Sequence, residues 1–256
     1  MRILGILNHK GGTGKTTTAV NLAAGLALRG SRVLAIDLDA QGSLATNLGV
    51  AYRHTLADLL LGRADLAACI QPARKNLDVI ASDYTLLEAE GALWRMDDRD
   101  ASRRLLRSKM NELDGYDFVI LDHSPSISLM GQNGLLYCRE LIVPVSMDYL
   151  AMVGTRQVMN TLKEIGRIPN HQLRLTAVAP TFYYGRLRKD REVLNTLKRY
   201  FNGRVTRPIR ANVKLAEAPG HHKTIYEYAP RSSGAQDYAQ LVERIANYGT
   251  RSGKTQ

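Results

Sequence analysis

The sequence predicts an α/β fold, with a doubly wound, mostly parallel sheet and helices on both faces. Short apolar runs at Ile3–Leu7, Val33–Asp37 and Phe118–Asp122 are typical of buried strands, and segments with helical spacing alternate with them. A length of 256 residues with 45% hydrophobic residues suits one domain of this class. We therefore expect a single domain over residues 1–256, with a polar C-terminal tail at about 249–256.

Further elements are expected along the chain. Apolar residues at helical spacing predict a helix over Ala19–Leu28 and short helices over Thr55–Ile70. The long, charged stretch Tyr84–Leu113 is also expected to be helical, and Asp97–Asp98 can interrupt it. The other expected strands are Leu77–Ala81, Glu140–Val145 and Leu173–Pro180, and the other expected helices are Tyr149–Ile165, Val193–Phe201 and about Ala235–Tyr248.

The stretch His9–Thr18, with the sequence His-Lys-Gly-Gly-Thr-Gly-Lys-Thr-Thr-Thr, carries the most specific signal. It lies between a predicted strand and a predicted helix, which is the context that a phosphate-binding loop requires. Glycines allow the backbone N–H groups to fold around a phosphate, and the helix directs its positive end toward the same anion. Lys15 is expected to reach the β- and γ-phosphates, and the Thr16 hydroxyl to bind Mg²⁺. A flexible surface loop is the alternative. The residues expected to bind the nucleotide here are Lys10, Gly11, Gly12, Thr13, Gly14, Lys15, Thr16 and Thr17.

The loop departs from the ordinary pattern at its first position. His9 stands where the usual phosphate loop has glycine, and a second lysine, Lys10, follows it. A cation at this position is poorly placed for the phosphates of its own loop. It is well placed to reach a nucleotide that another subunit holds.

Three aspartates lie at the carboxyl ends of predicted strands, and we expect these strand ends to lie close to the phosphate-binding loop. Asp37 and Asp39 come at the end of the second strand, and Asp122 ends the apolar run Phe118–Asp122. Parallel sheets place their chemistry at the carboxyl ends of their strands. An apolar strand that ends in aspartate is typical of a site that holds Mg²⁺ through water. An ordinary strand-end carboxylate is the alternative for Asp37. His123 is expected to be a bystander, with a catalytic role as the alternative.

The net charge of +11 is confined to one half of the chain. Residues 1–128 hold 15 Lys/Arg and 15 Asp/Glu, whereas residues 129–256 hold 20 and 9. A one-sided basic surface favours a polyanionic partner, with nucleic acid first, although a solvated basic face is the alternative. The segment Arg186–Arg231 contains 12 Lys/Arg and 4 Asp/Glu and no recognition-helix or zinc-finger pattern, so we expect non-specific DNA binding. The candidate DNA contacts are Arg186, Arg188, Lys189, Arg210, Lys214, Lys223 and Arg231.

The cysteines and the start of the chain indicate a cytoplasmic protein. Cys69 and Cys138 are far apart and have no metal-like spacing, which suits a reducing compartment. The sequence begins directly with a strand pattern, and it has neither a signal-peptide pattern nor an apolar run long enough to span a bilayer.

Three stretches resemble the ParA/MinD family of ATPases. Lys10–Thr17 resembles the deviant Walker A motif of these P-loop NTPases, and Asp37–Gly42 is similar to a second stretch of the same group. Ala211–Pro219 resembles a segment typical of the chromosomal ParA (Soj-like) branch, although Ala211 and Lys214 depart from its commonest form. The loop after Asp122 also departs, because Ser124 replaces the first of two usual prolines.

The resemblance implies a role for each candidate residue. Lys10, Lys15 and Asp39 would be catalytic, with Asp39 positioning the attacking water and Lys10 crossing to the partner's nucleotide in an ATP-sandwich dimer. Asp37 and Asp122 would serve Mg²⁺ through its water shell. The adenine site would come from Pro180, Thr181 and the segment around Pro208.

The function implied is that of a ParA-type ATPase with ATP and Mg²⁺ as cofactors. Its dimer would bind double-stranded DNA without sequence preference, at the nucleoid. A ParB-like adaptor would stimulate slow ATP hydrolysis and so partition a chromosome or plasmid. One alternative is positioning of a protein organelle such as a carboxysome, and another is a nucleotide-binding scaffold without turnover. A MinD-like membrane-cycling ATPase is disfavoured because Asn247–Gln256 lacks an amphipathic pattern, and an iron–sulfur reductase because Cys69 and Cys138 lack the expected setting.

Overall fold

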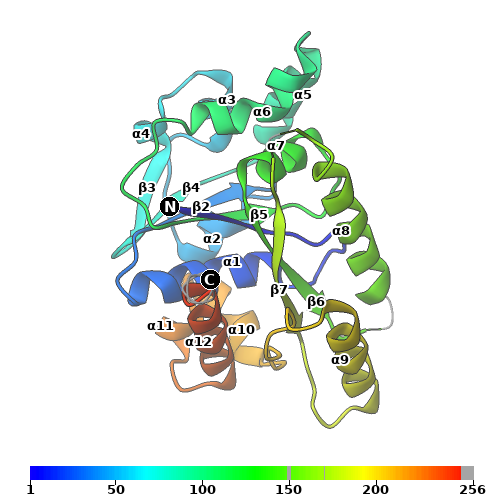
Figure 1. Ribbon diagram of the computed structural model, residues 1–256. Helices are drawn as coiled ribbons and strands as arrows, with labels where there is room; N and C mark the ends of the chain where they lie inside the picture. The colour runs from blue at the N-terminus through cyan, green and yellow to red at the C-terminus, as the bar shows by residue number, and fades with distance from the viewer. Residues whose placement is uncertain (149–150, 170, 249–256) are drawn as a thin grey trace, which may run out of the picture.

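The computed structural model describes residues 1–148, 151–169 and 171–248, and these form a seven-stranded sheet between two layers of helices (Figure 1). The strand order is β3-β4-β2-β5-β1-β6-β7. Every neighbouring pair is parallel except β3 and β4. The strands are β1 (Arg2–Ile6), β2 (Val33–Leu38), β3 (Ile70–Arg74), β4 (Leu77–Ile80), β5 (Phe118–His123), β6 (Glu140–Ser146) and β7 (Arg174–Thr181). The predicted doubly wound, mostly parallel α/β fold is confirmed.

Helices cover both faces of the sheet because its central strands are apolar on both sides. All residues of β2, β5 and β6 are buried, which is typical of strands that lie between two helical layers. One face packs against α1 (Lys15–Leu28), α2 (Ser43–Leu48), α11 (Ile225–Tyr228) and α12 (Ser233–Ala246). The other packs against α3 (Leu56–Leu61), α4 (Leu66–Cys69), α5 (Leu86–Arg95), α6 (Arg99–Lys109), α7 (Leu129–Tyr137), α8 (Ala151–Ile165) and α9 (Arg188–Phe201). The short helices α10 (Val213–Glu217) and η1 (Ala218–His221) precede α11.

The carboxyl ends of the central strands meet at one edge of the sheet. Asp37 at the end of β2 lies beside Asp122 at the end of β5, and Ile6 of β1 lies on the other side of Asp122. Because β1 leads into the glycine loop and α1, this register brings the loop and the two carboxylates together.

Several element boundaries differ from the prediction. α1 begins at Lys15 instead of Ala19, because the helix starts directly after the left-handed Gly14. α9 begins at Arg188 instead of Val193, and Lys189 and Arg191 belong to its polar face. The predicted interruption of Tyr84–Leu113 is confirmed by Asp98, whose side chain caps α6 by accepting from the backbone N–H groups of residues 100 and 101.

Six of the described elements were not predicted: β3, α7 and the short helices α2, α10, η1 and α11. β3 is an antiparallel edge strand with an exposed proline, Pro72, and such a strand lacks the apolar run of a buried one. α7 has buried residues almost all round and therefore no amphipathic period to recognise. None of the described helices has the length and apolar character needed to cross a bilayer. The expected polar tail at 249–256 lies outside the described residues.

Candidate functional site

The loop between β1 and α1 has the backbone shape of an anion cradle. Gly12 and Gly14 have φ values of +70° and +83°, in the left-handed region that favours glycine. The first backbone hydrogen bond into α1 runs from Thr18 N to Gly14 O, at 2.9 Å. The backbone N–H groups of residues 15–17 therefore have no carbonyl partner within the helix. No side chain caps the start of α1 either. This arrangement suits a phosphate at the helix N-terminus.

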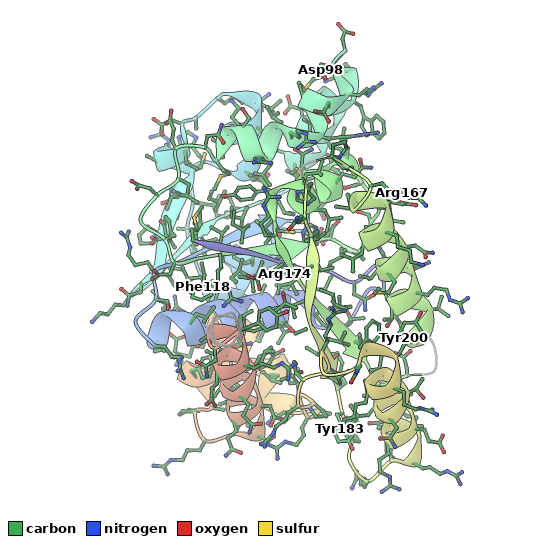
Figure 2. All side chains as sticks on the ribbon, in the orientation of Figure 1. Asp98, Phe118, Arg167, Arg174, Tyr183 and Tyr200 are labelled. Atoms are coloured by element: carbon green, nitrogen blue, oxygen red, sulfur yellow. The ribbon has the colours of Figure 1, made fainter. Side chains whose placement is uncertain are left out.

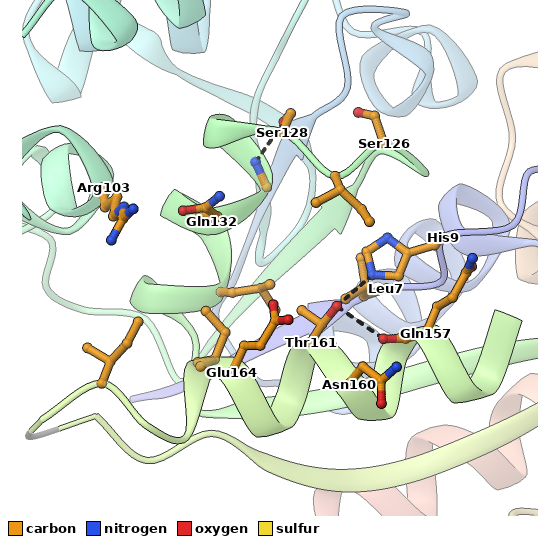
Figure 3. Close-up of a pocket in the computed structure, with 15 residues that line it drawn as sticks. Leu7, His9, Arg103, Ser126, Ser128, Gln132, Gln157, Asn160, Thr161 and Glu164 are labelled. Carbon is orange, nitrogen blue, oxygen red and sulfur yellow. Dashed lines mark hydrogen bonds between the residues drawn. The ribbon is translucent and has the colours of Figure 1, made fainter. Parts of the chain in front are cut away.

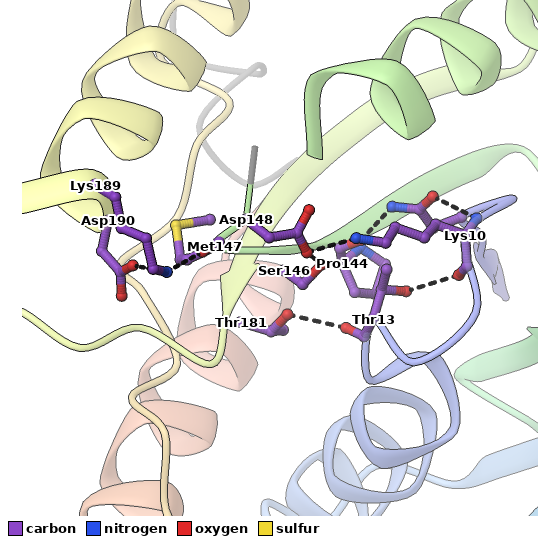
Figure 4. A network of polar contacts seen from close by, with 10 residues as sticks. Lys10, Thr13, Pro144, Ser146, Met147, Asp148, Thr181, Lys189 and Asp190 are labelled. Atoms are coloured by element: carbon purple, nitrogen blue, oxygen red, sulfur yellow. Dashed lines mark hydrogen bonds and ion pairs between the residues drawn. The ribbon is translucent and has the colours of Figure 1, made fainter. Parts of the chain in front are cut away.

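Neighbouring strands fix the shape of the loop (Figure 4). The Asn8 side chain accepts from Lys10 N at 3.0 Å and donates to Pro144 O of β6 at 2.7 Å. From β7, the Thr181 hydroxyl donates to Thr13 O at 2.9 Å. The bonds from Asn8 were not predicted, because nothing in the sequence near Asn8 indicates that β6 will be its neighbour.

The two lysines of the loop take different positions. The Lys15 side chain is largely buried, and its Nζ donates to Lys10 O at 3.1 Å. Burial lowers the pKa of Lys15, whereas the nearby Asp122 and Asp39 carboxylates oppose that shift. The Lys10 Nζ lies 2.5 Å from Oδ2 of Asp148, just after β6 (Figure 4). Lys15 therefore faces the cradle, while Lys10 is held to the side of it.

Asp37 and Asp122 form a buried carboxylate pair. Asp37 accepts hydrogen bonds from Asp39 N and Leu44 N, both at 2.9 Å. Both carboxylate oxygens of Asp122 are buried and lack a hydrogen-bond partner in the described part of the chain. Burial raises the pKa of Asp37 to about 7, with a contribution from the Asp39 charge. Burial and the Asp37 charge also raise the pKa of Asp122, while interactions with Thr16 and Lys15 lower it.

These two carboxylates fit a magnesium ion that keeps most of its water ligands. A buried, unpaired carboxylate is unfavourable unless a cation or donor compensates it. In the described residues, no group of three or more His, Cys, Asp or Glu side chains is placed to hold a metal ion. Mg²⁺ usually binds through one or two carboxylates, waters and substrate phosphates, so it does not need such a cage. The Thr16 hydroxyl, next to Asp122, completes the set expected for Mg²⁺.

Asp39 lies in the turn that connects β2 to α2. Its side chain is half-buried, and Oδ1 accepts from Gln41 N at 3.1 Å. The turn is held against the end of β4, since a Cβ on Gly42 would lie 2.4 Å from Ser82 O. The turn thus places Asp39 beside the carboxylate pair.

The predicted adenine residues lie on the other side of β1 from the carboxylates. Pro180 is buried within β7 and its carbonyl accepts from Ile209 N at 2.7 Å, so its ring is part of the core. Thr181 binds the phosphate loop, and Pro208 is half-buried next to Ile209. All three residues lie at or near the end of β7, and their role in binding adenine stays a prediction.

The two histidines near the loop point away from the cradle. His9 Nε2 lies 2.9 Å from the Thr161 hydroxyl of α8 and lines a cavity of about 500 Å³ between α7 and α8 (Figure 3). Neither the loop glycines nor Asp37, Asp39 and Asp122 line this cavity, so it is distinct from the cradle. His123 is buried between Gly5 and Gly134, and burial lowers its pKa to about 3. Its imidazole is therefore neutral and belongs to the packing of β5 against α7.

The seven candidate DNA contacts divide into two groups. Four form ion pairs within the protein: Arg188 with Glu192, Lys189 with Asp190, Arg210 with Asp237, and Lys214 with Glu217. Lys189 also donates to Met147 O at 2.6 Å (Figure 4). Arg186, Lys223 and Arg231 are exposed. The net positive charge of the segment therefore overstates the number of cations that face solvent without a nearby carboxylate.

Comparisons with known proteins agree with this geometry. A family model described as an AAA domain matches residues 1–175. The sporulation initiation inhibitor protein Soj of Bacillus subtilis is 36% identical over 253 residues, covering 97% of this chain and 99% of Soj. The chromosome-partitioning ATPase Soj of Thermus thermophilus is 37% identical over 252 residues, covering 96% and 95% of the two chains. The septum site-determining protein MinD from Pyrococcus horikoshii, solved with Mg-ADP, has a TM-score of 0.81 and 27% identity, covering 99% of both chains.

Near-complete coverage at this identity, together with the glycine cradle and the carboxylate pair, identifies the family. The chain belongs to the ParA/MinD family of ATPases, in its Soj-like branch.

Proposed function

We propose that this protein is a Mg²⁺-dependent ATPase that partitions a DNA cargo. The observation that carries the proposal is the pair of buried carboxylates, Asp37 and Asp122, beside a glycine cradle that contains Lys15. A cation and a polyphosphate together would compensate the charges that this arrangement leaves unpaired. The Soj relative named as an ATPase and the neighbour solved with Mg-ADP support ATP and Mg²⁺ as the cofactors.

The residues divide the chemistry among them. When bound, Mg²⁺ would supply positive charge that neutralises the phosphates. Lys15 would leave Lys10 O and bind the phosphates, while Thr16, Asp37 and Asp122 hold the ion directly or through its water shell. Asp39 would orient the attacking water from its fixed turn. Hydrolysis would then depend on positioning and charge stabilisation, without a covalent intermediate.

We propose that Lys10 takes part in dimer formation. In its ion pair with Asp148 the two side chains are 31% and 41% exposed, and such pairs contribute only about 0–1 kcal/mol. The lysine can therefore leave Asp148 at small cost and bind a nucleotide in a second subunit. Gly12 is exposed, and a Cβ added to it would meet no atom within 4 Å, so that side of the loop is open to a partner.

The dimer is tested by the mass of the protein with and without ATP. Lys10→Ala and Gly12→Val should both remain monomeric with ATP, whereas the parent should double in mass by light scattering. Gly203→Val is the matched control, because Gly203 also has φ of +70° and open space around it. A β-branched residue suffers the same backbone strain at both positions. If both loop variants dimerise like the parent, the sandwich dimer is wrong.

DNA binding is expected from the exposed cations. Each phosphate contact changes the slope of log K against log salt by about 0.9. Replacing Arg186, Lys223 and Arg231 together by Gln should therefore flatten the slope by about 3, whereas Arg95→Gln on α5 should not change it. Binding that does not depend on salt, or on the ATP state, would remove this part of the proposal.

The cargo would reach the ATPase through an adaptor. We propose that a ParB-like protein bound to a chromosome or plasmid stimulates hydrolysis, and that residues 1–256 act as one cytoplasmic, nucleoid-associated domain. Co-purification with an ATP-trapped Asp39→Ala variant tests this, and quantitative proteomics identifies the captured protein. A ParB-like protein is the expected result. An adaptor for a protein organelle would redirect the function to organelle positioning, and lipid-dependent sedimentation would redirect it to membrane cycling.

A further inference from the structure

Glu90, near the middle of α5, reaches the start of another helix. Its Oε1 accepts a hydrogen bond from Leu129 N at 2.8 Å and a second one from Met130 N at 3.3 Å. Leu129 and Met130 are the first two residues of α7. α5 and α7 lie next to each other (Figure 1), and α5 ends close to Asp98, which Figure 2 labels at the outer edge of the molecule. A carboxylate of one helix therefore holds the N-terminus of the other.

This carboxylate supplies what the first turn of α7 lacks. The first N–H groups of a helix have no carbonyl partner within the helix, and that end of the helix favours negative charge. Ser128 caps α7 by accepting from Gly131 N at 3.0 Å, but the first turn contains no acidic residue. Glu90 provides an acceptor for the N–H groups of residues 129 and 130 and also the negative charge. The position of the start of α7 is thus coupled to α5.

Glu90 is itself held in place by the packing of α5. The buried residues of α5 are Leu86, Ala89 and Leu93, and each is at most 4% exposed. Leu86 and Leu93 lie about one turn on either side of Glu90, so they flank it on the same side of the helix. The Glu90 side chain is half-buried beside them. It therefore extends to α7 from a part of α5 that the core fixes.

The start of α7 determines where the loop after Asp122 lies. β5 ends directly after Asp122, at His123, and residues 124–128 connect this strand to α7. A connection this short follows any movement of either end. Ser126 of the loop lines the same cavity as the first residue of the phosphate loop, His9 (Figure 3). The loop thus runs from the carboxylate pair past the phosphate loop to the helix end that α5 holds.

The sequence of this loop lacks a restraint that the family pattern provides. Ser124 stands where the family usually has the first of two prolines, and a proline would fix φ at this position. The hydroxyls of Ser124 and Ser126 lie 2.8 Å apart, but this contact is internal to the loop and does not set its place. Ile127 is 75% exposed, so core packing does not hold this part of the loop. Glu90 supplies a restraint from outside, at the α7 end.

We propose that Glu90 is a positioning residue for ATP hydrolysis, because it fixes the loop between Asp122 and α7. This inference rests on the proposed ATPase function and assigns a role to a residue that the sequence did not single out. Phosphoryl transfer depends on positioning, and a displacement of about 1 Å can slow a reaction about a hundred-fold. Glu90 would act only through the backbone N–H groups of α7. The competing role is a cap that stabilises α7 and leaves the reaction unaffected.

Three replacements separate the length of the side chain from its charge. Glu90→Gln keeps the length and an acceptor oxygen but removes the charge. Glu90→Asp keeps the charge on a side chain one methylene shorter, and Glu90→Ala removes the acceptor. The matched control is Glu88→Ala, because Glu88 is an exposed carboxylate of the same helix that pairs with Arg63 and not with α7.

The measurements are single-turnover ATP hydrolysis with Mg²⁺ and the affinity for Mg-ADP by calorimetry, both below the unfolding temperature of each variant. The Ala and Asp variants should hydrolyse ATP on the order of ten-fold more slowly, yet bind Mg-ADP within about two-fold of the parent. Glu90→Gln should stay within about three-fold of the parent's rate, because it still accepts from α7. Glu88→Ala should match the parent in both measurements.

Two results would overturn the inference. One is parent-like hydrolysis by the Ala and Asp variants, even with a lower melting temperature, since Glu90 would then only cap α7. The other is an equal loss of hydrolysis rate and of Mg-ADP affinity, which would indicate a general disturbance of the site. If Glu90→Ala does not fold, the Asp and Gln variants decide, and equal rates for these two exclude positioning. A parent that hydrolyses no ATP would instead overturn the proposed ATPase function.

Discussion

The buried carboxylate pair makes the stability of the metal-free protein depend on pH in an unusual direction. The pKa of Asp37 rises from its ordinary value of 3.8 to about 7, mainly because of burial. Between these values the unfolded chain has lost the proton while the folded protein keeps it. The free energy of unfolding therefore falls as the pH rises through this window. The shift corresponds to a loss of about 4 kcal/mol above pH 7.

Asp122→Asn tests this reasoning because it removes the neighbouring charge. Asparagine has nearly the same volume, so the change removes the charge and keeps the packing. In EDTA at pH 8 the variant should be more stable than the parent by about 1–3 kcal/mol, and the difference should shrink toward pH 5. Asp97→Asn, at an exposed position between α5 and α6, should leave the parent's pH dependence unchanged.

The measurement is urea unfolding followed by circular dichroism from pH 5 to 8. Adding Mg²⁺ and ADP should stabilise the parent more at pH 8 than at pH 6, because the ion binds the ionised carboxylates, and the variant should lose most of that gain. If the free energies of unfolding of the parent and Asp122→Asn change with pH in parallel, the raised pKa values of the buried pair are wrong. An equal stabilisation of both proteins by Mg²⁺ and ADP would also contradict the account of the pair.

Three further predictions follow from packing, charge and catalysis. Gly134→Ala should lower the free energy of unfolding by about 1–3 kcal/mol, because the new Cβ would lie 2.6 Å from Cε1 of His123; unchanged urea unfolding would contradict this. Arg210→Ala should cost about 1–2 kcal/mol by leaving the buried Asp237 with fewer donors, and Arg210→Lys should recover part of it. Asp39→Ala should bind ATP like the parent but hydrolyse it at least about a hundred-fold more slowly; single-turnover rates near the parent's would exclude a role in orienting water.

Sequence alone was sufficient for the parts of the site that are contiguous in the chain. The glycine loop and its helix follow from the stretch around Lys15, and an apolar strand ending in Asp122 predicts a carboxylate at the sheet edge. These features depend on local conformation and on periodicity, which neighbouring residues determine. The break before α6 could be predicted for the same reason, since Asp98 caps a helix with its own side chain.

Tertiary structure decided which side chains meet across long separations in the sequence. Lys10 pairs with Asp148, and Arg210 pairs with Asp237, but nothing local identifies either partner. A count of charges predicted a basic surface without showing which cations already bind a carboxylate. Glu90 holds the start of α7 only because α5 and α7 pack together. The register of the sheet and the packing of helices on it fix these distant contacts, so they appear only when the whole chain has folded.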